Sequence, residues 1–234
     1  MRLLLTIIVV LISLQSISGN GEGSGYRILR TGVFHGDEVV PVENHDWYGL
    51  FKTGTTYELR AVSVHTNRAY DVVVDDDGDT TGIEVSIDQP EEPLLLIQTV
   101  KPLKTGRVST VFDDPQLFEL GSTVHLGSHD LAALGEVTDE GAGPGNLFLK
   151  KFRVVMYDFP DDTRRQTLFE HKRITYDGVP SLIWAGDLDG DGQPDLLMDI
   201  TDHYNVIEWA LYLSSEADEG EMVKLVAVFR TTGC

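Results

Sequence analysis

The stretch WAGDLDGDGQPDLLMDI, residues 184–200, places five aspartates within seventeen positions and interleaves them with glycines and apolar residues. The segment before the aspartates, SLIWAG, and the segment after them, DLLMDI, are apolar and strand-like rather than helical. Short apolar runs bounded by glycine and proline are typical of buried strands. The stretch therefore predicts a strand, a tight acidic loop and a second strand.

The spacing of the carboxylates predicts a calcium loop. Counted from the first aspartate, carboxylates occupy positions 1, 3, 5 and 9, which are Asp187, Asp189, Asp191 and Asp195. Position 6 is Gly192, which permits a sharp turn, and position 7 is Gln193, which offers its backbone carbonyl. Two carboxylates about 4 Å apart repel each other by about 4 kcal/mol at an effective dielectric constant of roughly 20. A bound Ca²⁺ ion, which takes roughly six to eight oxygens, would turn this repulsion into attraction, whereas magnesium prefers fewer protein ligands.

The loop resembles the calcium site of FG-GAP repeats, which occur in integrin α-subunits and in bacterial VCBS-type repeat proteins. Their D-x-[DN]-x-D-G-x-x-D motif, followed by an apolar strand, matches residues 187–198. An EF-hand does not fit, because position 12 is Met198 instead of glutamate and the flanks are not helical. FG-GAP modules form propellers from several repeats, but this motif occurs once, so the resemblance implies a calcium loop without a full propeller. The last fifty residues also resemble secreted bacterial proteins that carry one such loop.

A second acidic run, VVVDDDGDTTGIEV, offers a weaker metal candidate. Its Asp75, Asp77 and Asp79 occupy positions 1, 3 and 5, but position 6 is Thr80 and position 9 is Ile83. Because two requirements of the calcium loop fail, a turn between two strands explains this run better.

The rest of the sequence from Tyr26 onward predicts an all-β fold with few short helices. About ten to twelve segments rich in β-branched and aromatic residues are separated by turn residues; the main ones are 57–65, 68–74, 82–88, 93–100, 106–112, 146–159, 165–176, 179–187, 208–215 and 221–230. Residues 128–137 and 214–223 could each hold a helical turn or two. We expect an antiparallel sandwich or a barrel-like meander.

The N-terminal residues predict secretion. Residues 1–18 place Arg2 before an apolar run and end in small residues, which is the layout of a signal peptide. The alternative is an uncleaved anchor, but the apolar run is shorter than the roughly 20 residues that span a bilayer. Residues 19–25 form a flexible polar linker, and residues 26–234 form a single β-rich domain with a candidate sub-division near 137–146. We expect a secreted or periplasmic protein that does not insert into a membrane once the signal is removed.

Charge and cysteine content restrict the partners. The chain has 18 Lys and Arg against 38 Asp and Glu, for a formal net charge of −20. Such a surface repels nucleic acid and anionic lipid, so we exclude both as partners. The single cysteine, Cys234, is the last residue, so it cannot form an internal disulfide but could join two chains in a dimer.

No motif typical of a catalytic site occurs: the sequence lacks G-x-S-x-G, H-E-x-x-H and a phosphate-binding glycine loop. His125 and His129 have the H-x-x-x-H spacing of a zinc pair, but Gly127 and Ser128 favour a loop over the helix that such a pair needs. Four aromatic residues could form a carbohydrate platform, although core positions explain them better: Trp47, Tyr48, Trp184 and Trp209.

The sequence favours a non-enzymatic, calcium-binding module of the cell envelope or exterior. Its protein or carbohydrate ligand is not identified by any motif. The alternative is a secreted hydrolase, for example one acting on carbohydrate, in which the calcium loop only stabilises the fold. A pocket that converges on two close carboxylates, or His129 beside Asp130 and a serine, would favour the hydrolase.

Overall fold

The computed structural model describes residues 25–40, 42, 46–138, 148–175 and 178–233. The predicted signal peptide, the linker before Gly25, the glycine-rich loop after residue 138 and Cys234 lie outside these residues. Within the described part of the chain all regular secondary structure is β, which confirms the predicted all-β class. The described residues include no helix that is long and apolar enough to cross a membrane.

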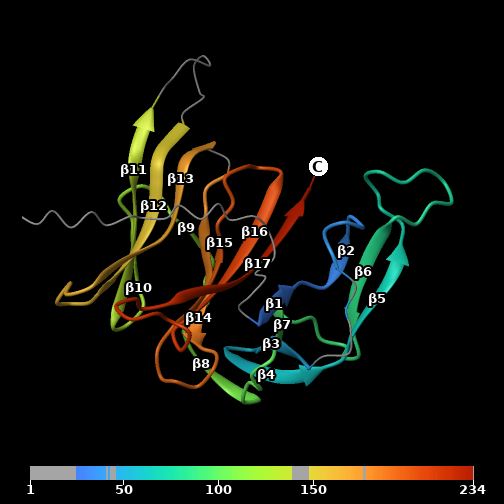
Figure 1. The fold of residues 1–234 in the computed structure, drawn as a ribbon, viewed down its shortest axis with the longest axis horizontal. Coiled ribbons are helices and arrows are strands. Elements are labelled where there is room, and N and C mark those ends of the chain that lie inside the picture. The colour runs from blue at the N-terminus through green and yellow to red at the C-terminus, as the bar shows by residue number, and fades with distance from the viewer. Residues whose placement is uncertain (1–24, 41, 43–45, 139–147, 176–177, 234) are drawn as a thin grey trace, which may run out of the picture.

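The described strands form three antiparallel sheets (Figure 1). The ten-stranded sheet has the order β1 (Tyr26–Leu29), β7 (Leu95–Thr99), β3 (Trp47–Thr53), β4 (Thr56–Val62), β8 (Gly106–Phe112), β14 (Ser181–Asp187), β15 (Asp195–Asp199), β16 (Val206–Leu213) and β17 (Lys224–Thr232), with β9 (Gln116–Leu117) paired to β14. The four-stranded sheet has the order β10 (Thr123–His125), β11 (His129–Thr138), β12 (Phe148–Asp158) and β13 (Arg165–Thr175). The three-stranded sheet has the order β2 (Gly32–Phe34), β6 (Gly82–Ile87) and β5 (Val64–Ala69).

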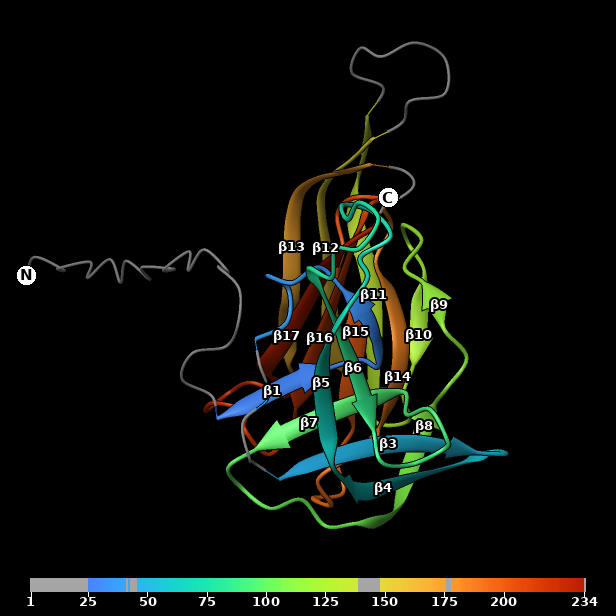
Figure 2. The same cartoon turned by 90° about the vertical axis from the view of Figure 1, so that its right-hand side faces the viewer.

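The ten-stranded sheet curls into a nearly closed barrel, because β1 at one end of the strand order contacts β17 at the other. The four-stranded and three-stranded sheets lie on opposite sides of it (Figures 1 and 2). One core includes Ile28, Leu50 and Leu211 of the curled sheet. A second core joins strands β14–β17 to the four-stranded sheet and includes Leu131 and Val154. Strands β14–β17 therefore carry buried residues on both faces.

Burial on both faces explains the apolar run that follows the acidic loop. Leu197 on β15 belongs to the first core, whereas its neighbours Leu196 and Met198 belong to the second. Successive side chains of a strand point to opposite faces, so a strand with one wet face would alternate apolar and polar residues. A strand covered on both faces has a continuous apolar run instead.

Replacement of Leu197 by alanine is expected to destabilise the protein by about 2–5 kcal/mol, because it leaves a cavity in a fully buried site. Urea unfolding followed by tryptophan fluorescence would measure the loss. Leu117→Ala is the matched control: that side chain is 56 % exposed, so we expect a change within about 0.5 kcal/mol. Equal losses in the two variants would contradict the burial argument.

The prediction of a strand over residues 68–74 is wrong beyond Ala69, where β5 ends. The Asp71 carboxylate accepts the Val73 N–H at 3.0 Å, and the Asp75 carboxylate accepts the Asp71 N–H at 2.8 Å. Such local side-chain acceptors compete with strand pairing for the backbone donors. The result is a turn that leaves Val72 84 % exposed.

The two segments expected to hold helical turns contain none. Residues 129–138 form strand β11, which pairs with β10 on one side and β12 on the other and buries Leu131 and Ala133. Sheet pairing on both sides overrides the weak helical preference of the Leu-Ala-Ala-Leu sequence. Residues 214–223 form hydrogen-bonded turns, with the Ala217 N–H donating to the Ser214 carbonyl at 3.1 Å.

Candidate metal centre

The predicted strand–loop–strand unit is present, and its hairpin geometry positions the first and last aspartates. Strand β14 ends at Asp187 and strand β15 begins at Asp195. Gly186 pairs with Asp195 in the antiparallel register, so the two carboxylates lie at the end of the strand pair that the loop closes. Residues 188–194 form the connecting loop, which we call the metal loop together with Asp187 and Asp195.

Two glycines shape the metal loop around Asp187. Gly190 has a φ of 84° and Gly192 a φ of 86°, which are left-handed conformations that favour glycine. The Gly190 N–H donates to Asp187 Oδ1 at 2.8 Å, and the Gly192 N–H donates to Oδ2 at 3.1 Å. The loop backbone therefore supports the Asp187 carboxylate.

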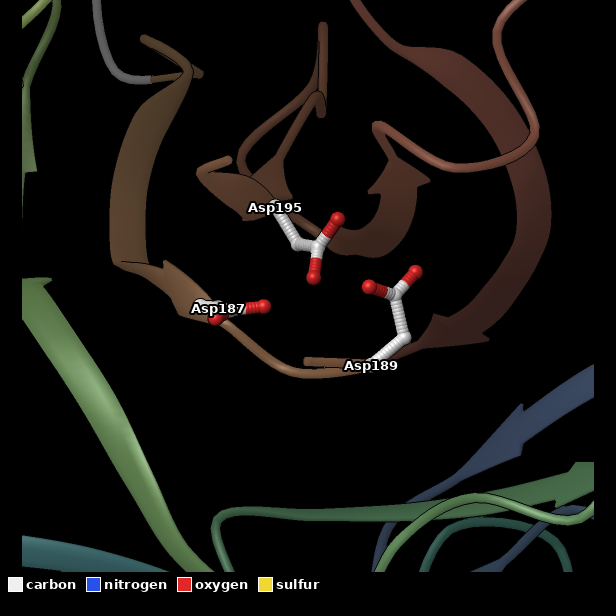
Figure 3. Close-up of side chains that lie close together, drawn as sticks. All are labelled: Asp187, Asp189 and Asp195. Atoms are coloured by element: carbon white, nitrogen blue, oxygen red, sulfur yellow. The ribbon is translucent and has the colours of Figure 1, made fainter. Parts of the chain in front are cut away.

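Three carboxylates converge on one point. One oxygen from each of Asp187, Asp189 and Asp195 lies within 4.8 Å of the other two (Figure 3). Oxygens that bind one calcium ion at about 2.3–2.6 Å are at most about 5 Å apart, so this spacing fits a shared ion. Among the described residues, this is the only group of three or more potential metal ligands.

Asp195 is the anchor of the group, because it is fully buried. Its carboxylate accepts the Leu188 N–H at 2.7 Å and both the N–H and the hydroxyl of Ser214 at 2.8 and 3.0 Å. Burial raises the pKa of Asp195 to about 7, and the charge of Asp189 adds to the effect. The pKa of Asp189 is also raised, mainly by its own burial. A bound cation would remove the energetic cost of charging these groups.

The structure brings together three of the four predicted carboxylates, and Asp191 lies outside the group. Its carboxylate accepts the Gln193 N–H at 2.8 Å and the Ser214 hydroxyl at 3.0 Å. Gln193, which the sequence assigns as a carbonyl ligand, lies in the same loop and lines a neighbouring cavity. In this structure Asp191 therefore ties the loop at Gln193 to Ser214 instead of joining the three converging carboxylates.

Two serines that the sequence does not single out hold the aspartates in place. Ser214 follows β16 and bonds both Asp191 and Asp195, and the Ser215 hydroxyl donates to Asp189. They reach the loop because β16 pairs with β15, with Tyr212 opposite Leu196. The only sequence signal is a pair of serines after an apolar strand, which acquires meaning only once the strand order is known.

Ser214→Ala is expected to weaken calcium binding by about 10–100-fold, because it removes one hydroxyl that orients two aspartates. Calorimetric titration of the chelator-treated protein would measure the change. Ser86→Ala on β6 provides the control and is expected to retain wild-type affinity. Unchanged affinity in Ser214→Ala would show that this hydroxyl does not orient the ligands.

The second acidic run, with Asp75, Asp77 and Asp79, forms a turn and not a group of converging carboxylates. The Asp75 carboxylate accepts the Thr81 N–H at 2.8 Å, the Asp71 N–H at 2.8 Å and the Thr81 hydroxyl. Asp77 and Asp79 are exposed. Asp75 thus holds together the turn between β5 and β6.

The two histidines of the H-x-x-x-H spacing bond to different partners. His125 Nδ1 lies 2.8 Å from Asp130 Oδ1, whereas His129 Nδ1 lies 2.9 Å from the Ser128 hydroxyl. They flank the turn between β10 and β11, in agreement with the loop that the sequence predicts.

The aromatic residues behave mainly as core. Trp47, Tyr48 and Trp184 are buried. Trp209 is partly buried, and the guanidinium of Arg30 lies 4.3 Å from its ring centroid. No exposed aromatic platform is formed by these residues.

Comparison with known proteins leaves the metal centre as the main guide to function. No protein-family model matches the chain, and no curated protein or solved structure is detectably similar to it.

Proposed function

We propose that the protein is a secreted, non-enzymatic β-domain that binds one calcium ion at Asp187, Asp189 and Asp195. The observation that carries the proposal is the position of Asp195, a fully buried carboxylate that faces two others. Buried charges in proteins are normally paired or coordinated to a metal. The residues around the group donate hydrogen bonds but include no Lys or Arg bonded to these carboxylates among the described contacts.

Calcium is the ion that this ligand set favours. Magnesium dehydrates reluctantly and usually binds one or two protein carboxylates, whereas calcium accepts many oxygens in flexible geometry. The motif supplies carboxylates at positions 1, 3, 5 and 9, so Asp191 would be a further ligand if its side chain turned inward. Extracellular calcium is typically present at high concentration, so a dissociation constant of about 10⁻⁴–10⁻³ M would suffice outside the cell.

The role of the ion would be structural. It would link the end of β14 to the start of β15 and, through Ser214, to the end of β16. These strands have buried residues in both cores of the molecule. A chain without an internal disulfide would gain a cross-link between three adjacent strands that separate its two cores.

Calorimetric titration of chelator-treated protein tests this proposal. We expect one calcium site per chain, with magnesium bound much more weakly, and we expect Asp189→Asn to abolish the signal. Asp161→Asn makes the same chemical change at an exposed position and should bind as the wild type does. No calcium binding by the wild type would overturn the proposal, and the 184–200 stretch would then be an acidic turn.

The hydrolase alternative depends on His129. Its Nδ1 lies 2.9 Å from the Ser128 hydroxyl, and its Nε2 lies 3.5 Å from Asp158 Oδ1. However, the Asp158 carboxylate already accepts two bonds from Arg164 at 3.0 Å and one from Thr163 at 2.6 Å. Burial lowers the pKa of His129, which makes it a weaker base. Covalent labelling of Ser128 by a fluorophosphonate probe would favour the hydrolase over the binding module.

A further inference from the structure

A cavity of about 360 Å³ lies directly beside the metal loop. One side is lined by residues of the four-stranded sheet and its β12–β13 turn, including His129, Met156 and Arg164. The other side is lined by the metal loop and the segment after β16, including Gln193 and Ser214. Cavities of about 300–1,000 Å³ are the usual size of small-molecule sites.

Hydrogen bonds to fixed partners hold the walls of this cavity in place. Arg164 donates through Nε and Nη2 to the two oxygens of Asp158, both at 3.0 Å. The side-chain amide of Gln166 accepts the Met222 N–H at 2.7 Å and donates to the Val223 carbonyl at 2.6 Å. Ser214 is bonded to Asp191 and Asp195. The wall that includes Arg164 and Met222 is therefore ordered without the metal loop, which lowers the conformational entropy lost when a ligand binds.

The chemistry of the lining suits a ligand with both donors and acceptors and no net charge. Arg164 and Glu221 contribute one charge of each sign. Burial lowers the pKa of His129, so its ring is neutral near pH 7. Gln193 can donate and accept hydrogen bonds, whereas the Ser214 hydroxyl can only accept, because its proton is donated to the carboxylates of Asp191 and Asp195. A charged ligand would meet one like charge in the cavity, and an anion would also be repelled by the formal net charge of −20.

We propose that this cavity binds a sugar ring, a neutral ligand whose hydroxyls pair with Arg164, Glu221, Gln193 and Ser214. Met222, which is 7 % exposed, offers a small apolar surface to the C–H groups of the ring. The inference rests on the proposed function in one respect: calcium would fix the wall formed by Gln193 and Ser214. Calcium should therefore strengthen sugar binding by ordering that wall.

Saturation-transfer NMR with glucose, galactose, mannose and N-acetylglucosamine at millimolar concentration tests the inference in the presence of calcium. Glucuronate and glucosamine serve as the negatively and positively charged comparisons. We expect transfer to at least one neutral sugar, and weaker transfer to both charged analogues. No transfer to any neutral sugar, or stronger transfer to a charged analogue, would overturn the assignment.

Two variants link the signal to the cavity. Ala217 lines the cavity and is partly exposed, so Ala217→Trp should fill the space and remove the signal, whereas Ala217→Ser should retain it. Glu221→Lys, at an exposed position, should shift the preference from neutral sugars towards glucuronate. A signal that survives in Ala217→Trp, or a preference unchanged in Glu221→Lys, would place the sugar elsewhere and overturn the inference.

The same samples separate this inference from the calcium proposal. Thermal melts with calcium and with chelator report ion binding independently of the sugar signal. A sugar signal in wild type without any calcium-induced shift would support the cavity and contradict the calcium site. A calcium-induced shift without a sugar signal would support the calcium site and contradict the sugar-binding cavity.

Discussion

Calcium added to chelator-treated wild-type protein is expected to raise its melting temperature by about 5–10 °C. A ligand present at about 100 times its dissociation constant stabilises the folded state by about 2.7 kcal/mol. For a chain of this size, each kcal/mol corresponds to about 2–4 °C. Magnesium at the same concentration should give a much smaller shift. Differential scanning fluorimetry at low ionic strength would measure both.

The structural reason is the reversal of charge interactions at the metal loop. Without an ion, three carboxylates repel one another, because oxygens of Asp187, Asp189 and Asp195 lie within 4.8 Å of one another. This repulsion reduces the stability of the fold. With calcium bound, each charge becomes a ligand. Removal of one carboxylate should therefore have opposite effects in the two conditions.

Asp189→Asn tests this reversal. It keeps the shape of the side chain and an oxygen able to accept the bond from the Ser215 hydroxyl. In chelator we expect the variant to melt no lower than the wild type, and in calcium we expect it to melt well below the wild type. Asp161→Asn should follow the wild type in both conditions. If calcium shifts neither protein, the loop is not a metal site.

The sequence predicted the strand–loop–strand unit because every residue needed for it lies within one short stretch. The positions of Asp187, Asp189 and Asp195 follow from local spacing, and so do the positive φ angles at Gly190 and Gly192. The all-β class likewise depends on local alternation and turn residues. These features require no knowledge of which strands become neighbours.

The features that the sequence did not predict depend on contacts between distant segments. Ser214 reaches Asp195 only because β16 pairs with β15. Residues 129–138 are a strand only because β10 and β12 lie on either side of them. The turn after Ala69 is different, because Asp71 and Asp75 act locally. There the three valines at 72–74 favoured the prediction of a strand. Short polar side chains at both ends of such a run favour a turn instead.

The stability of the chelator-treated protein is expected to fall as the pH rises from 5 to 7.5, because of Asp195. Burial raises the pKa of this group to about 7 in the folded protein, compared with 3.8 for an ordinary aspartate. Its contribution to stability is fully present below the unfolded pKa, where both states are protonated. As the pH rises, the unfolded state releases its proton first, so stability is lost until the pH passes the folded pKa. A shift of about three pKa units corresponds to at most about 4 kcal/mol.

Calcium should flatten this response, because the unfolded state is already deprotonated above about pH 5 and the ion keeps the folded state deprotonated as well. The ion binds the charged carboxylate, so protons compete with it below pH 7 and its affinity rises with pH. The difference in melting temperature between calcium and chelator should therefore be small at pH 5.5 and large at pH 7.5. Melts across this range in both conditions would measure the difference directly.

Asp195→Asn isolates the contribution of Asp195 from those of other titrating groups. The pKa of His35 is raised by its hydrogen bond to Asp71, whereas burial lowers the pKa of His129, so these groups have opposite effects on stability in the same pH range. Both histidines are retained in the variant, so the stability of the wild type minus that of the variant reports the contribution of Asp195 alone. In chelator, this difference should decline as the pH rises towards 7, because only the wild type has to bury a charge. A difference independent of pH would mean that Asp195 is ionised throughout, and the charge cost that calcium is proposed to offset would then lie elsewhere.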